Sequence, residues 1–155
     1  MKYVLWGFLG LALLAFLVLI LLAVQSRTPP VTLGLDGGRL RPCPATPNCV
    51  SSQAPQETAR VAPLAYSGSA RQAWRRLQQV IEAAGGDIVT RQDAYLHATF
   101  VTPWLRFVDD VECLLDARAG VIHVRSASRT GRSDFGVNRK RVEAIRSGLS
   151  EMDYR

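Results

Sequence analysis

Arginine and hydroxyl side chains recur through residues 125–139, which read RSASRTGRSDFGVNR. The planar guanidinium group of arginine donates paired hydrogen bonds to phosphate or carboxylate oxygens. Serine and threonine hydroxyls add donors, and glycines let backbone N–H groups approach a ligand. A helix that begins near Asn138 would add the free N–H groups of its first turn. The segment is therefore a candidate anion-binding site, with the residues Arg125, Ser126, Ser128, Arg129, Arg132, Ser133, Asn138 and Arg139. The alternative is that its arginines pair with nearby carboxylates in an internal ion-pair network that fixes the polar loop on the sheet.

The acidic run DDVE, residues 109–112, lies in a stretch whose apolar residues alternate as they do in a β-strand. This alternation places Asp109 on the apolar face, and Asp110 and Glu112 on the other face. A carboxylate among apolar side chains needs a partner or a neutral state. We therefore predict a structural ion pair for Asp109, and a larger loss of stability in Asp109→Ala than in Glu112→Ala. The nearest partners in the sequence are Arg125, Arg129 and Arg132.

The residue pattern assigns no catalytic residue. Asp109 and Asp110 are adjacent on a strand and point to opposite faces, so they are poorly placed to act as a pair of carboxylates. Neither His97 nor His123 lies in a nucleophile context, and His97 is expected on a polar strand face. The histidine and cysteine spacing predicts no metal site, and no cofactor is expected.

Two cysteines, Cys43 and Cys49, lie close together in the proline-rich run RPCPATPNCVSS. Two thiols so near in a stiffened loop favour a short disulfide, which persists only in an oxidising compartment. Cys113 lies in an alternating apolar stretch and is expected to be a buried free thiol. The cysteines thus place the domain on the periplasmic or lumenal side of a membrane.

The membrane is indicated by an apolar run at residues 4–24, with no charge between Lys2 and Arg27. At about 1.5 Å per residue, a helix of this length crosses the ~30 Å hydrocarbon core of a bilayer. The run is longer than the apolar part of a secretory signal peptide, and no small-x-small cleavage site follows it. We predict a single-pass signal anchor at residues 1–25; a cleaved signal peptide is the alternative. Positive charges near the two ends of the run do not decide its orientation.

Charge suggests the kind of partner. The chain has 19 Lys and Arg against 13 Asp and Glu, a net charge of +6. A basic domain beside a bilayer suits anionic lipid headgroups, envelope polyanions or acidic proteins. A nucleic-acid partner is not expected, because no motif of basic and aromatic residues accompanies the charge.

The remaining pattern predicts an α+β fold, a mostly antiparallel sheet with two helices packed on it. Residues 26–59, rich in Pro, Gly, Ser and Thr, are expected to form a tether and the Cys-stapled loop, and residues 60–155 the core. Trp74 and Trp104 are expected in that core. The expected strands are 60–66, 88–91, 95–101, 105–116 and 121–126, and the expected helices are 70–84, with a capping box at Ser69, and 138–149.

Three polar segments together resemble a family of proteins, the domain-of-unknown-function family 1499. They are PCP and PNCVSS at 42–52, DDVE at 109–112, and RSASR followed by G, SD, G and NR at 125–139. The resemblance covers about residues 40–149 and implies no biochemical activity. Family members of bacterial-envelope or chloroplast type mildly support an extracytoplasmic domain.

The sequence leaves two possible functions open. The first is a non-enzymatic, membrane-anchored binding or scaffolding module of the cell envelope, whose Arg/Ser segment recognises an anionic group. In this interpretation Arg132, between Gly131 and Ser133, is the arginine most free for a ligand. The alternative is an envelope hydrolase or transferase that acts on an anionic substrate, with Asp109 or Asp110 as the base.

Overall fold

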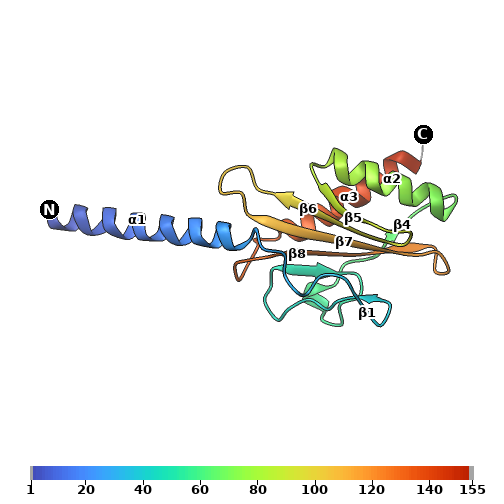
Figure 1. Ribbon diagram of the computed structural model, residues 1–155, viewed down its shortest axis with the longest axis horizontal. Helices are drawn as coiled ribbons and strands as arrows, with labels where there is room; N and C mark the ends of the chain where they lie inside the picture. The colour runs from blue at the N-terminus through green and yellow to red at the C-terminus, as the bar shows by residue number, and fades with distance from the viewer. Residues whose placement is uncertain (1, 154–155) are drawn as a thin grey trace.

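The computed structural model describes residues 2–153, and its central feature is an antiparallel sheet (Figure 1). Within these residues six strands form the sheet, in the order β3-β8-β7-β6-β5, with β4 paired to β8. A separate two-stranded ladder joins β1 (Leu35–Asp36) and β2 (Arg39–Leu40). The strands of the main sheet are β3 (Cys49–Ser51), β4 (Leu64–Ala65), β5 (Asp87–Arg91), β6 (Tyr95–Val101), β7 (Val108–Asp116) and β8 (Val121–Ser128).

Two helices, α2 (Ala70–Ala83) and α3 (Val137–Asp153), cover one face of this sheet (Figure 1). At the start of α2, Ser69 and Gln72 form the predicted capping box, which supplies hydrogen bonds to backbone N–H groups at the helix end. Apolar side chains of both helices and of the strands fill the space between the layers. The α+β prediction is confirmed, and the fully buried side chains of this core include Leu77, Ile81, Leu96, Val111, Ile122, Val124, Val142 and Ile145.

The other face of the sheet is covered by the segment between α1 and β3, in which β2 contacts β7 and β8 (Figure 1). The short helix η1 (Glu57–Ala59) follows β3. The Gly34 N–H donates to Glu112 Oε1 on β7 at 2.7 Å, and Ser26 O accepts from Arg129 Nη1 at 3.2 Å. The proline-rich segment therefore packs onto the sheet, and polar groups lie beneath it.

The apolar run forms α1 (Lys2–Gln25), a single helix that projects away from the domain (Figure 1). Its length and composition are those of a helix that crosses a membrane, and most of its side chains are exposed. Its C-terminal end contacts the domain: Ala23 and Ser26 are buried, and the Val108 N–H donates to Ser26 Oγ at 3.1 Å.

Two predicted elements are shorter than the sequence pattern indicates. The strand expected at 60–66 is reduced to β4, and the strand expected at 105–116 begins only at Val108. Arg106 has a positive φ of 58°, which interrupts an extended strand. The Thr102 N–H donates to Phe107 O at 2.9 Å and closes the loop between β6 and β7. In this loop Trp104 is 94% exposed, so its prediction as a core residue is wrong.

Candidate anion-binding site

The three polar segments singled out in the sequence lie side by side in the sheet. β3 carries the end of the cysteine-rich run, β8 carries the Arg/Ser run and β7 carries DDVE. Val50 lies opposite Ser126 on β8, and Ser126 lies opposite Val111 on β7. Antiparallel pairing therefore brings together residues as far apart in the chain as Cys49 and Ala127.

Two asparagines join the loop that precedes β3 to the loop that follows β8. Asn48 Nδ2 donates to Gly131 O at 2.7 Å, and its backbone O accepts from Asn138 Nδ2 at 3.1 Å. Asn138 Nδ2 also donates to Ser128 Oγ, and Asn138 Oδ1 accepts from Ser126 Oγ at 2.6 Å. The predicted candidates Ser126 and Asn138 are thus buried and hydrogen-bonded to each other.

Asp109 forms a buried ion pair, but with a partner that the sequence did not suggest. Its Oδ2 accepts from Arg141 Nη2 at 2.7 Å, so the expected pairing with Arg125, Arg129 or Arg132 is wrong. The reason is topological: α3 returns across the face of the sheet on which Asp109 lies, and Arg141 is on its second turn. The Arg141 guanidinium also lies 4.8 Å from the ring centre of Phe100, a cation–π distance.

Asp110 is the centre of a second cluster, on the opposite face. It accepts two hydrogen bonds from Arg129, at 2.8 and 2.7 Å, and lies 2.7 Å from His97 Nε2. Burial alone raises the pKa of this carboxyl, but the bonds from His97 and Arg129 outweigh it, so the pKa is lowered. His97 lies on this polar face, as expected, and it is buried there.

Glu112 is the centre of a third cluster and is 0% exposed. Its Oε2 accepts from Arg125 Nη1 at 2.7 Å, and its Oε1 accepts from Tyr95 Oη and from the Gly34 N–H, both at 2.7 Å. Burial, together with the Glu112 carboxylate, raises the pKa of the Tyr95 hydroxyl above its ordinary value. Glu112 and Asp109 are therefore both buried in ion pairs, so we now expect Glu112→Ala to destabilise the domain as well.

A cavity of about 390 Å³ opens beside these clusters, and we call it the arginine cavity. Arg125 and Thr130 line it, and each carries a buried atom, Nε and Oγ1 respectively, that has no hydrogen-bond partner within the described residues. Leu22 and Gln25, at the end of α1, also line it. The arginine cavity therefore lies next to the apolar helix, and two of its lining residues hold a buried donor without a partner. The other polar residues around it include Thr46, Asn48, Asp110, Ser128 and Arg129.

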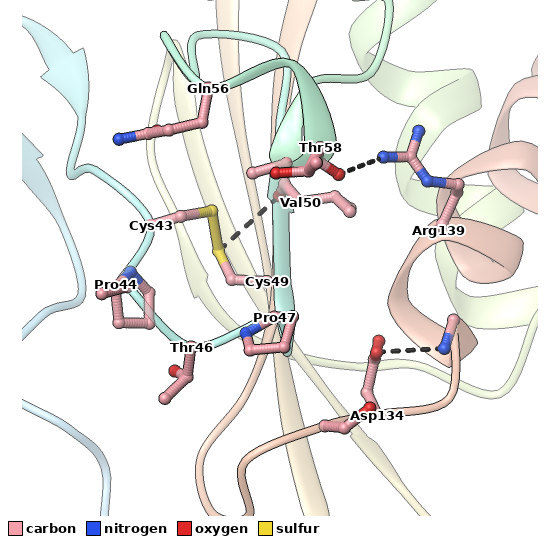
Figure 2. Close-up of a pocket in the computed structure, with 14 residues that line it drawn as sticks. Cys43, Pro44, Thr46, Pro47, Cys49, Val50, Gln56, Thr58, Asp134 and Arg139 are labelled. Carbon is pink, nitrogen blue, oxygen red and sulfur yellow. Dashed lines mark hydrogen bonds between the residues drawn. A yellow bond between two sulfur atoms is a disulfide. The ribbon is translucent and has the colours of Figure 1, made fainter.

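A second cavity, of about 480 Å³, is also lined by the cysteine loop (Figure 2). Cys43 and Cys49 form the predicted disulfide, and both line this cavity together with Ser133. The Arg139 guanidinium donates to Thr58 O at 2.8 Å, which ties α3 to η1.

Asp134, in the same cavity, accepts from the backbone N–H groups of Asn138 and Gly136, at 2.8 and 3.0 Å. These bonds lower the pKa of the Asp134 carboxyl, although its partial burial acts in the opposite direction. Asp134 thereby occupies the N-terminal end of α3, where a bound anion was expected.

The residues predicted to bind an anion therefore do not form a single site. Arg125, Ser128 and Arg129 line the arginine cavity, Ser133 and Arg139 line the second cavity, and exposed Arg132 lines neither. Thr130, whose hydroxyl is one of the donors expected from the Arg/Ser run, also lines the arginine cavity. Sequence reasoning missed Tyr95, whose spacing from His97 on one strand was the available signal. It also missed Arg141, for which the sequence offered no signal because its partner lies 32 residues away.

The protein is a small α+β domain that follows an apolar N-terminal helix, and its three polar segments meet in buried clusters on the two faces of the sheet. The domain belongs to the family described as protein of unknown function, DUF1499, whose profile matches residues 39–149. The family resemblance expected from the sequence is thus confirmed over nearly the expected range. No curated protein matches the chain.

Proposed function

We propose that this protein is a membrane-anchored binding module of the cell envelope that holds an anionic group in the arginine cavity. The observation that carries the proposal is the pair of buried groups without a partner, Arg125 Nε and Thr130 Oγ1. An arginine Nε–H can only donate, so the group that satisfies it must present an acceptor. Phosphate and carboxylate oxygens are the strongest acceptors for a guanidinium group.

A retained anchor is supported by the way in which α1 joins the domain. Arg129 Nη1 donates to Ser26 O and Arg27 O, both at 3.2 Å, directly after the end of α1. Val108 donates to Ser26 Oγ. Cleavage after the apolar run would remove part of the wall of the arginine cavity, because Leu22 and Gln25 line it. These contacts favour a signal anchor over a cleaved signal peptide.

The ion pairs of the buried carboxylates favour a binding function over a catalytic one. Asp109, Asp110 and Glu112 each accept a hydrogen bond from an arginine at 2.7 Å. A general base must be within reach of a substrate proton and free to accept it. These acids are instead held in ion pairs, so the hydrolase or transferase alternative gains no specific support from them.

The binding proposal predicts that inorganic phosphate stabilises the full chain in detergent micelles. A ligand that binds only the folded state raises the free energy of unfolding, by about 2.7 kcal/mol at a hundred times its Kd. Thr130→Val removes one hydroxyl donor at nearly constant volume. We expect it to weaken phosphate binding roughly tenfold, as expected for one charge-assisted hydrogen bond. The shift in melting temperature at increasing phosphate measures both effects.

Arg132→Ala is the matched control, because Arg132 is exposed and lines neither cavity. Chloride at equal ionic strength separates site binding from screening. A phosphate response that is equal in the wild type and in Thr130→Val, but reduced in Arg132→Ala, would move the site to the exposed loop. A response to phosphate no larger than the response to chloride would rule out the proposal.

An envelope location predicts the state of the cysteines in the cell. Thiol counting on protein extracted from membranes without reductant should find one free thiol, the buried Cys113, and only after denaturation. The Cys43–Cys49 disulfide should contribute about 2–3 kcal/mol in the chain-entropy estimate. Three free thiols in protein trapped at the moment of lysis would place the domain in a reducing compartment.

A further inference from the structure

Two large aromatic side chains stand almost fully in solvent on separate loops. Trp104, in the β6–β7 loop, is 94% exposed, and Phe135, in the β8–α3 loop, is 92% exposed. Phe135 has a positive φ of 52°, an uncommon conformation for an aromatic residue. Its N–H donates to Ser133 Oγ at 3.3 Å, so the loop holds this conformation with its own side chains. Neither ring contributes to the core of the domain.

Both loops lie at the end of the sheet where α1 joins the domain (Figure 1). The β6–β7 loop leads into Val108, whose N–H donates to Ser26 Oγ. The β8–α3 loop begins at Arg129, which donates to Ser26 O. Ser26 directly follows α1, so the two loops lie on either side of the end of this helix.

This arrangement sets the depth of the two loops relative to a bilayer that α1 crosses. The apolar run ends at Val24, and the polar residues Gln25 and Ser26 mark the edge of the hydrocarbon core. Aromatic residues, and tryptophan above all, concentrate at this depth, where the ring is shielded and its N–H meets the headgroups. Arg106 and Arg132 lie in the same two loops, and arginine is favoured next to anionic headgroups.

We infer that the β6–β7 and β8–α3 loops form a membrane-contact surface that inserts Trp104 and Phe135 into the headgroup region of the bilayer crossed by α1. The inference rests on the part of the proposed function that keeps α1 in the membrane, and it is independent of anion binding. The surface fixes the domain upright on the membrane, so that the arginine cavity opens at the lipid surface.

The test is fluorescence of the full chain in phosphatidylcholine vesicles whose acyl chains carry bromine just below the headgroups. Trp6→Phe removes the tryptophan of α1 and leaves Trp104 and Trp74, which is a buried residue of α2. We expect bromine to quench most of the Trp104 emission. The quenching should disappear in Trp6→Phe/Trp104→Phe and return when Phe135→Trp is added to that double variant.

Ala117→Trp in the same double variant is the matched control, because Ala117 is exposed in the β7–β8 turn at the opposite end of the strands. Its emission should be unaffected by bromine. If bromine does not quench Trp104 although the protein stays with the vesicles after an alkaline wash, the membrane-contact surface is ruled out and the membrane anchor is still supported. Release of the protein by that wash would instead overturn the anchor.

Discussion

Glu112→Ala should lower the free energy of unfolding by about 3–5 kcal/mol, because it leaves the Arg125 cation buried without its partner. The same change removes the acceptor of the Tyr95 hydroxyl and of the Gly34 N–H. The expected loss is a large part of the stability of a small domain, which is typically about 5–15 kcal/mol. Denaturant unfolding of the full chain in micelles, followed by circular dichroism, measures it.

Glu143→Ala is the control for this experiment, since Glu143 pairs with Arg146 on the surface of α3 and such pairs contribute about 0–1 kcal/mol. A double variant, Glu112→Ala/Arg125→Met, tests the mechanism. Because it removes both charges, it should lose less stability than the sum of the two single variants. Additive losses would show that Glu112 stabilises the domain through packing alone.

Arg129→Ala should lower the free energy of unfolding by a similar amount, and it should also loosen the junction between α1 and the domain. Asp110 loses two hydrogen bonds and keeps only His97, so a buried carboxylate is left without its main partner, at a cost of about 3–5 kcal/mol. The backbone oxygens of Ser26 and Arg27 also lose their donor. The junction between α1 and the domain should therefore open more often.

Limited trypsin digestion measures this opening, because Arg27 is exposed and lies at the junction. We expect faster cleavage after Arg27 in Arg129→Ala than in the wild type. Arg132→Ala, in the same loop region but exposed, should be cleaved there at the wild-type rate. Equal cleavage in both variants would mean that Arg129 does not hold α1 against the domain.

The sequence predicts the parts of the structure that are periodic or local. The helix faces of α2 and α3, the capping box at Ser69 and the disulfide between Cys43 and Cys49 follow from spacing alone. The apolar helix follows from an unbroken run of residues. Each of these features depends on residues within a few turns or one short loop, where local rules apply.

The errors come from contacts between distant segments. The sequence pairs Asp109 with a nearby arginine, but the packing of α3 on the sheet brings Arg141 to it instead. The composition of residues 26–59 predicts a tether and a stapled loop, and it does not predict that Gly34 donates to Glu112 across the sheet. The residue type of Trp104 favours burial, although its loop lies beside the end of α1 and leaves it exposed.

The most direct measurement of the central proposal is the NMR resonance of the Arg125 Nε–H in full-length protein with ¹⁵N-labelled arginine, in micelles. Arg125→Lys identifies the signal by its loss. Titration with inorganic phosphate should move this resonance in a saturable way, because the buried Nε–H gains an acceptor, while the Nε–H of Arg132 stays in place. An Arg125 signal that is unchanged while phosphate moves only exposed arginines would contradict an anion site in the arginine cavity.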